Sequence, residues 1–410
     1  MGGPGKFLKE NFSGNITVLK GKSILLGITG SVAAYKSIEL IKRLREEEAS
    51  VRVIMTGASK RFITPLSIEL AAGDRVYSDM FETPLSHISL PADSDLFVIA
   101  PATANIIGKY ANGIADDLLS TALLAYNGTV IIAPAMNWRM YENRAFQKGL
   151  NYLSSIGVKT VGPEQGNLAC GEEGVGRMAD VERIMESIIT ALTKQDLAGE
   201  QVLVTAGPTR EYIDPIRYLS NRSSGKMGCA LAKIAGRRGA EVTLICGPLS
   251  VAPPDNIDNV ITVETADSMY AAVMENLPMS SIFIMSAAVA DFMPVETKES
   301  KIEKKDKLQL NLVKTRDILE SVGRLKNKPF TVGFAAETGY RPDRARKKLL
   351  GKDIDMIVFN DVSQKDAGFD TDTNEVVIID RDREKKLPLM SKKDVSMAIF
   401  DRILELKDNR

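Results

Sequence analysis

The chain has 410 residues, of which 44% are hydrophobic and 26% are charged, a composition typical of globular protein and a length that predicts two domains. Lysine plus arginine and aspartate plus glutamate number 53 each, so charge gives no reason to expect nucleic acid or a membrane surface as a partner. The expected partners are small molecules and further copies of the chain.

Targeting and redox features predict a cytoplasmic protein. Residues 1–20 form a polar, glycine-containing arm without the apolar core of a signal peptide. No apolar run reaches the ~18 residues that span a bilayer. The three cysteines, Cys170, Cys229 and Cys246, are an odd number without paired spacing, which predicts reduced thiols. His87 is the only histidine, so it is the one candidate for any imidazole chemistry.

Two segments open in the same way, with an apolar run, a glycine turn and a helical pattern. The run 23–28 precedes Gly30, and apolar residues from Ala34 to Leu44 follow at helical spacing. The run 201–204 precedes Gly207 in the same manner. Further apolar runs separated by helical stretches predict parallel sheets covered on both faces. We expect an arm (1–20), a first α/β domain (21–192), a linker (193–200) and a second α/β domain (201–410).

The turn after the first run is a candidate phosphate site. Unpaired N–H groups at a helix N-terminus favour an anion, Gly30 permits close approach and Ser31 adds a hydroxyl. The full dinucleotide fingerprint is absent, which favours a mononucleotide. An ordinary strand–helix turn is the alternative, and these residues alone leave both open.

Polar and small residues follow two further strands of the first domain. The segments 101–105 and 134–137 come after apolar runs, at the edge where open α/β sheets bind ligands. The glycine-dense stretch 166–178 carries Cys170 and predicts a mobile lid rather than core. A buried small residue is the alternative for Cys170.

The second domain repeats this pattern with different residues. Segment 220–228 places small, polar and glycine residues before a helix and predicts an anion cradle, although its glycine spacing excludes a P-loop. Segments 286–292, 334–338 and 360–363 each end a predicted strand. Lys348 and Lys352 share a helix face, which alone favours a solvated surface.

Together the motifs resemble the bifunctional phosphopantothenoylcysteine decarboxylase / phosphopantothenate–cysteine ligase family, from about Gly21 onward. In the first domain the resemblance rests on Pro101–Asn105, Gly113–Leu118, Pro134–Asn137 and Ala169–Met178. In the second it rests on the run from Thr205 to Gly228. The resemblance implies a flavodoxin-like or Rossmann-like three-layer domain that binds FMN, followed by a Rossmann-like ligase domain.

The family's residue roles carry over to matching positions. The resemblance implies that FMN is bound by Gly30, Ser31, Thr56, Ala102, Thr103 and Asn105. His87 matches an active-site histidine, Asn137 a ligand of the substrate carboxylate, and Cys170 a proton donor. The pattern departs at Pro91–Asp93, where relatives carry a basic residue and an aromatic, so local packing is in doubt there.

For the ligase the resemblance implies 4′-phosphopantothenate, cysteine, Mg²⁺ and CTP, with ATP as the open alternative. Asn221 handles the acyl-nucleotide intermediate and Lys301, on a lysine-rich flap, reaches the reacting phosphate. The implied nucleotide ligands are Ser286, Ala287, Asp291, Lys301, Phe334, Lys348 and Lys352. Glu303 stands where the flap pattern has a lysine, and we expect it to point outward. The metal ligands cannot be assigned from the sequence.

Assembly follows from the same resemblance, which implies trimeric decarboxylase contacts and dimeric ligase contacts, hence a closed homo-oligomer such as a dodecamer. Two other functions compete with this interpretation. A flavoprotein decarboxylase of another cysteine substrate shares the first-domain motifs but lacks a ligase domain. A non-catalytic flavoprotein-like subunit that inhibits phosphatases carries a long acidic tail, which is absent here.

Overall fold

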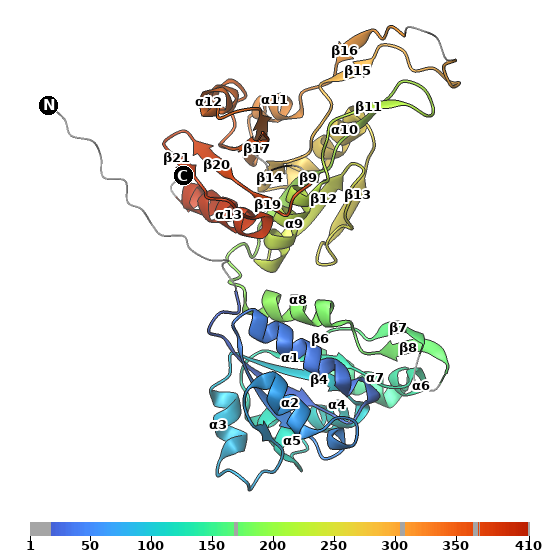
Figure 1. Cartoon of the computed structure of the whole chain (residues 1–410), viewed down its shortest axis with the longest axis vertical. Coiled ribbons are helices and arrows are strands. Elements are labelled where there is room, and N and C mark those ends of the chain that lie inside the picture. Colours follow the sequence, from blue (N-terminus) through green and yellow to red (C-terminus); the bar gives the residue numbers. More distant parts are fainter. Residues whose placement is uncertain (1–17, 168–170, 304–307, 364–367, 369, 409–410) are drawn as a thin grey trace, which may run out of the picture. The chain divides into compact units, whose positions relative to one another are not determined.

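The computed structural model describes residues 18–167, 171–303, 308–363, 368 and 370–408 (Figure 1). These residues form two compact units, which divide between Thr193 and Lys194. Each unit is built around its own sheet, as the sequence predicts.

The first sheet is entirely parallel, in the order β3-β2-β1-β4-β5-β6. Its strands are β1 (Ser23–Ile28), β2 (Ser50–Met55), β3 (Val76–Tyr77), β4 (Leu96–Ala102), β5 (Val130–Pro134) and β6 (Lys159–Thr160). The central strands β1, β4 and β5 are almost wholly buried, since helices cover both faces. This confirms the parallel, doubly covered sheet.

Helices cover the two faces of this sheet in two groups (Figure 1). One face packs against α1 (Lys36–Glu46), α2 (Pro65–Ala72) and α8 (Val181–Leu192). The other packs against α3 (Ser86–Ala92), α4 (Ala104–Ala111), α5 (Leu118–Ala125) and α7 (Arg144–Ser155). Short elements complete the unit: η1 (Val32–Tyr35), η2 (Ser59–Arg61) and α6 (Trp138–Tyr141).

A two-stranded hairpin, β7 (Glu164–Asn167) and β8 (Glu173–Arg177), extends from the first unit. Its second strand runs against the segment after β5, because the N–H of Met136 donates to the carbonyl of Gly176 at 3.0 Å. A Cβ on Gly176 would lie 2.1 Å from the carbonyl oxygen of Met136. Only glycine therefore permits this approach of the two backbones.

The second sheet has eight strands in the order β13-β12-β9-β14-β17-β18-β20-β21. They are β9 (Gln201–Ala206), β12 (Glu241–Cys246), β13 (Asn259–Thr262), β14 (Ile282–Met285), β17 (Phe330–Glu337), β18 (Met356–Asp361), β20 (Val376–Asp380) and β21 (Glu384–Lys386). The last two strands run antiparallel, unlike the repeated parallel pattern that the sequence predicts. The described part of the β18–β20 connection contains no helix, and a parallel return needs such a crossover.

Helices again cover both faces. One face packs against α9 (Lys226–Arg237) and α13 (Lys392–Asp408), and the other against α10 (Ala266–Asn276), α11 (Ile318–Gly323) and α12 (Pro342–Gly351). The remaining elements are β10 (Arg210–Tyr212), β11 (Tyr218–Ser220), η3 (Leu277–Met279), β15 (Phe292–Pro294), β16 (Leu312–Lys314), β19 (Thr373–Asn374) and β22 (Met390–Ser391). Among the described residues, every helix is too short or too polar to cross a bilayer.

The close approach at Gly176 predicts a specific cost for enlarging that residue. Gly176→Ala should lower the free energy of unfolding of the first unit by about 1–3 kcal/mol, because the methyl group meets backbone rather than a flexible side chain. Urea titration followed by the fluorescence of Trp138, the only tryptophan, measures this unit alone. Gly108→Ala is the control: Gly108 lies in α4 with open space beside it, so alanine should stabilise by roughly 0.5–1 kcal/mol. Equal stability of both variants would contradict the packing argument.

Candidate active sites

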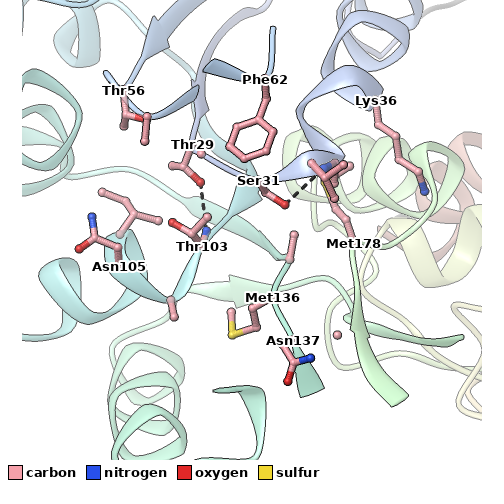
Figure 2. A pocket seen from close by; sticks show the side chains of 18 of the residues that line it. Thr29, Ser31, Lys36, Thr56, Phe62, Thr103, Asn105, Met136, Asn137 and Met178 are labelled. Atoms are coloured by element: carbon pink, nitrogen blue, oxygen red, sulfur yellow. Dashed lines mark hydrogen bonds between the residues drawn. The ribbon is translucent and has the colours of Figure 1, made fainter. Parts of the chain in front are cut away.

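The first unit has a cavity of about 1280 Å³ at the carboxyl ends of its central strands (Figure 2). The residues after β1, β2, β4 and β5 line it, together with residues of the β7–β8 hairpin. This is the edge at which open parallel sheets bind ligands, and the position that the sequence predicts. This volume is at the large end for ligand pockets, which commonly measure about 300–1,000 Å³.

Thr29 joins the two central strands beside this cavity. Its buried hydroxyl donates to the carbonyl of Pro101 at 2.7 Å and accepts from the N–H of Thr103 at 3.0 Å (Figure 2). The turn after β1 is thereby fixed to the loop after β4. Sequence reasoning missed this role, although the position of Thr29 as the first residue after a strand was available.

The glycine turn after β1 has a packing role, whichever of the two interpretations from the sequence holds. A Cβ on Gly30 would lie 2.6 Å from the Cβ of Ala58, so glycine is needed first for packing against the loop after β2. Ser31 caps η1, its hydroxyl accepting from the N–H of Ala33 at 3.3 Å. Both residues still line the cavity.

Most of the residues predicted for the first site meet at this cavity. Those that line it are Gly30, Ser31, Thr56, Thr103, Asn105 and Asn137. Ala102 does not, because it is buried at the end of β4, where its carbonyl accepts from the N–H of Ala135 at 3.0 Å. Cys170 lies outside the described residues. Its role stays a prediction.

His87 does not line the cavity of its own chain. It lies on α3, half-buried, and within the described structure its Nδ1 is buried without a hydrogen-bond partner. The surface beside it is apolar, since Phe81, Leu85 and Ile88 are exposed.

The cavity also has an apolar lining that sequence reasoning missed. Phe62, Ile106, Met136 and Met178 contribute to it from four separate segments (Figure 2). Aromatic and thioether side chains pack well against a flat ring system. No motif marks these positions, because apolar residues at strand ends resemble ordinary core.

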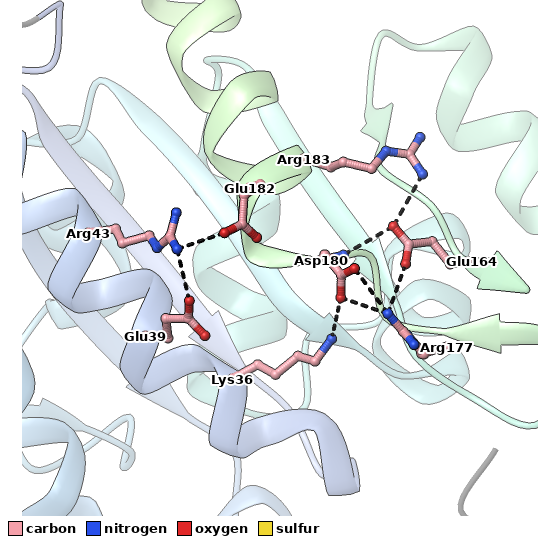
Figure 3. A network of polar contacts seen from close by, with 8 residues as sticks. All are labelled: Lys36, Glu39, Arg43, Glu164, Arg177, Asp180, Glu182 and Arg183. Carbon is pink, nitrogen blue, oxygen red and sulfur yellow. Dashed lines mark hydrogen bonds and ion pairs between the residues drawn. The ribbon is translucent and has the colours of Figure 1, made fainter. Parts of the chain in front are cut away.

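A network of charges fixes the base of the hairpin (Figure 3). Arg177 of β8 donates to Asp180 at 2.9 and 3.0 Å and pairs with Glu164 of β7 at 3.4 Å. Lys36 donates to Asp180 at 2.9 Å, and this bond holds the pKa of that carboxyl below its usual value. Lys36, Arg177 and Asp180 line the cavity, so the network places charge at its rim.

The second unit has a cavity of about 880 Å³ at the corresponding edge of its sheet. Thr205, at the end of β9, matches Thr29: its buried hydroxyl accepts from the N–H of Ala287 at 3.2 Å, beyond β14. The predicted residues that line this cavity are Asn221, Ser286, Ala287, Asp291, Phe334, Lys348 and Lys352. Asn221 is held by the carbonyl of Val289, to which its amide donates at 2.9 Å.

Lys348 and Lys352 belong to the cavity and not to a solvated helix face. Burial, followed by the charge of Lys352, lowers the pKa of Lys348, which donates to the carbonyl of Phe334 at 3.3 Å. Lys352 pairs with Asp317. Burial alone would raise the pKa of that carboxyl, but the hydrogen bond from Lys352 brings it below its usual value. The lining as a whole carries more cationic side chains than carboxylates, which leaves the cavity attractive to a polyanion.

Two further lysines line the cavity from the other face of the sheet. Lys226 begins α9 and pairs with Asp372 at 2.7 Å. Lys392 begins α13 and donates to the carbonyl of Gly368 at 3.2 Å. Burial, together with the charge of Lys226, lowers the pKa of Lys392 to about 8. Lys226 belonged to the predicted anion cradle, whereas nothing in the sequence pointed to Lys392.

Lys301 is exposed and does not line the cavity, and Glu303 is exposed as expected. The buried carboxylate of Asp214 anchors this segment. It accepts from the N–H groups of Ile216 and Arg217 at 2.8 Å each and of Ile302 at 3.1 Å. Burial alone would raise the pKa of the Asp214 carboxyl, but these hydrogen bonds lower that pKa from 3.8 to about 2. The described residues contain no cluster of His, Cys, Asp and Glu that could hold a metal ion.

Comparison with known proteins identifies a family match for each unit. The Flavoprotein family matches residues 15–193, and the DNA/pantothenate metabolism flavoprotein C-terminal domain matches residues 197–406. A coenzyme A biosynthesis bifunctional protein CoaBC from Haemophilus influenzae is 45% identical, over 94% of this chain and 98% of its own length. Another from Bacillus subtilis is 44% identical, over 95% of this chain and 98% of its own. The crystal structure of the C-terminal domain of a CoaBC protein is 37% identical and covers 53% of this chain and 100% of that domain, with a TM-score of 0.46.

The anchoring of the segment around Lys301 generates a prediction. Asp214→Ala should release the N–H of Ile302, so trypsin should cut after Lys301 several-fold faster than in the wild type. Glu296→Ala is the control, because that carboxylate pairs only with the exposed Lys298 at 2.7 Å. Unchanged cleavage in Asp214→Ala would remove Asp214 from this role.

Acid should have the same effect on the wild-type chain. A carboxyl whose pKa is lower in the folded chain than in the unfolded chain stabilises the fold at pH values above its unfolded-state pKa. This stabilisation is lost as the pH falls through the folded-state pKa. The anchor should therefore weaken between about pH 4 and about pH 2. Hydrogen exchange of the 296–303 peptide measures this loss.

Proposed function

Because the chain belongs to the family of bifunctional coenzyme A biosynthesis proteins, we propose that it joins 4′-phosphopantothenate to cysteine in its second domain and decarboxylates the product in its first. One observation carries the proposal: predicted residues from distant segments meet at two cavities, each at the carboxyl edge of its own sheet. The presence of a matched second domain opposes both competing functions, a decarboxylase of other cysteine substrates and a binding subunit.

FMN fits the first cavity. Gly30 and Ser31 lie at the end suited to its phosphate, and Phe62 and Met136 offer apolar surface to the ring. The volume leaves room for a substrate beside it. When bound, the flavin would take two electrons from the substrate thiol, which would provide an acceptor for the electron pair that carbon dioxide leaves behind, and it would return those two electrons afterwards, so that it would end the reaction unchanged.

The chain's own residues then have three tasks in decarboxylation. Asn137 binds the substrate carboxylate, which keeps that group fixed above the reacting carbon. Cys170 returns the proton, since a thiol can act as a general acid. His87 orients the substrate from a neighbouring copy, since it lies away from the cavity of its own chain.

Ligation takes place in two displacements in the second cavity. The carboxylate of 4′-phosphopantothenate attacks the α-phosphorus of CTP, and pyrophosphate leaves with the bonding pair. The amine of cysteine then attacks the acyl carbon, the nucleoside monophosphate leaves, and the amine proton passes to solvent. Asn221 holds the acyl nucleotide, while Asp291, Phe334, Lys348 and Lys352 bind the nucleotide with Ser286 and Ala287.

Charge at this cavity supports a triphosphate as the nucleotide. Lys348, Lys352, Lys226 and Lys392 line it, and in this proposal Mg²⁺ enters bound to the triphosphate. Lys301 reaches the reacting phosphate from its exposed segment. We assign cytosine as the base of the nucleotide because of the family resemblance. Use of ATP in preference to CTP would change this assignment to adenine.

Assembly follows from exposed apolar surface on each unit. On the first unit Phe81, Leu85 and Ile88 surround His87, and on the second unit Ile216, Tyr218 and Phe292 are exposed on its small hairpins. We assign the first surface to a trimer contact and the second to a dimer contact, which together close a homo-oligomer. The cytoplasm is the compartment that fits, because Cys229 and Cys246 are buried free thiols.

Product analysis tests both activities together. The FMN-loaded chain, with 4′-phosphopantothenate, cysteine, Mg²⁺ and CTP, should yield 4′-phosphopantetheine and pyrophosphate by mass spectrometry. ATP in place of CTP should give at least tenfold less product if a cytosine contact worth ~1.4 kcal/mol selects the base. Accumulation of phosphopantothenoylcysteine would leave only the ligase standing, and no product with either nucleotide would refute the proposal.

Mixing variants tests whether His87 acts on a neighbouring copy. His87→Asn and Asn137→Ala should each lose decarboxylation by at least tenfold. Oligomers that contain both variants should regain activity, because one copy supplies an intact cavity and another supplies an intact histidine. Native mass spectrometry verifies the mixing. Mixed oligomers without recovered activity would assign His87 to its own chain or to no role.

A further inference from the structure

Cationic side chains line the second cavity from both faces of its sheet. Lys348 and Lys352 come from α12 and the residue after it, whereas Lys226 and Lys392 begin α9 and α13 on the opposite face. Lys226 and Lys392 lie close enough together that the charge of Lys226 lowers the pKa of Lys392. The proposed ligation has two phosphorylated substrates, and the cavity has two separate cationic sides.

The N-terminus of α9 adds positive charge to the side formed by α9 and α13. The N-cap residue is Gly225, which has no side chain to accept from the first N–H groups of this helix of 12 residues. Residues 225–228 line the cavity. The N–H groups at the start of a helix and the positive end of its dipole favour a bound phosphate.

The carboxylate that pairs with Lys226 is open to exchange. Asp372 accepts from the Nζ of Lys226 at 2.7 Å, but the side chain of Asp372 is 89% exposed, so solvent screens the pair. The same Nζ donates to the carbonyl of Asp370 at 2.9 Å, a bond that positions the ammonium group without neutralising it. A phosphate dianion can therefore displace Asp372 while Lys226 stays in place.

Two buried amides on this side have oxygens without a donor. Asn360 and Asn374 line the cavity and are 9% and 3% exposed, and within the described structure the Oδ1 of each has no hydrogen-bond partner. Asn360 lies on the face covered by α9 and α13, because it follows the core residue Val358 by two positions on β18. A buried acceptor without a donor is costly, so these amides favour a ligand that carries O–H or N–H groups.

We propose that the α9–α13 side of the second cavity binds 4′-phosphopantothenate. Lys226, Lys392 and the N-terminus of α9 bind its phosphate. The amides of Asn360 and Asn374 turn toward the cavity, and their oxygens accept from the hydroxyl and the amide N–H that follow the phosphate along the substrate. An ionised triphosphate chain carries acceptors alone and would leave both oxygens without a donor. The assignment rests on the proposed ligation and leaves the α12 side to the nucleotide.

Removing one cation of the α9–α13 side should weaken one substrate only. Lys226→Gln should raise the KM for 4′-phosphopantothenate at least tenfold, the size expected for losing a charge-assisted hydrogen bond, and should change the KM for CTP less than about twofold. Lys352→Gln should have the reverse effect. Lys347→Gln is the matched control, because it removes the same charge from an exposed residue of α12 that does not line the cavity. The release of pyrophosphate in the presence of cysteine measures both constants.

An altered substrate tests the amide oxygens. An analogue of 4′-phosphopantothenate with hydrogen in place of its hydroxyl should have a kcat/KM at least tenfold lower in the wild type, because a site that binds a hydroxyl rejects a ligand without one. In the double variant Asn360→Ala/Asn374→Ala the kcat/KM values of the analogue and the natural substrate should agree within about twofold.

The outcomes are distinct. A higher KM for 4′-phosphopantothenate alone in Lys226→Gln, with the analogue rejected by the wild type and not by the double variant, supports the inference. A higher KM for CTP alone would assign this side to the triphosphate, equal rises would indicate a general effect of charge, and unchanged constants would leave Lys226 without a role in binding. Each of these results overturns the inference, as does a wild type that accepts the analogue equally well. Absence of pyrophosphate release from the wild-type chain would refute the proposed ligation itself, and the inference with it.

Discussion

Both cavities depend on a threonine hydroxyl at the point where strand order reverses. In the first sheet β1 lies between β2 and β4, and Thr29 bonds the turn after β1 to the loop after β4. In the second sheet β9 lies between β12 and β14, and Thr205 accepts from the residue beyond β14. At such a point the connections after the two neighbouring strands leave toward opposite faces of the sheet, and a crevice opens between them. A buried hydroxyl at the end of one strand can bridge the two connections. These bonds join the connections that carry several of the candidate residues.

The sequence predicts the parallel part of both sheets, because that part depends on a pattern that repeats along the chain. Continuous apolar runs predicted parallel strands covered on both faces, and the structure confirms this for the first sheet. The antiparallel pair β20 and β21 was not predicted, since an apolar run carries no direction. The direction of a strand depends on the connection that precedes it. The described part of the connection between β18 and β20 has no crossover helix, which a parallel return would need.

The candidate sites were predictable where a motif interrupts the apolar pattern. Thr103 directly follows β4, Asn137 lies in the connection after β5, and Asn221 follows the hairpin strand β11; all three line a cavity. Phe62 and Lys392 were missed for opposite reasons. The first resembles core, while the second is a lysine at the start of a helix, where solvent exposure is the ordinary expectation. Only the folded chain reveals that Lys392 is buried beside Lys226.

The two cavities share an architecture and differ in what their linings can stabilise. Apolar side chains in the first favour a flat, largely uncharged ring, and its charges stand at the rim, paired around Asp180. The second gathers lysines from α9, α12 and α13, and burial lowers the pKa of two of them. A lowered lysine pKa means that keeping the lysine protonated in the folded chain costs free energy. A bound polyanion would offset that free energy. Ligand binding at this cavity and the free energy of folding would then be linked through the same lysines.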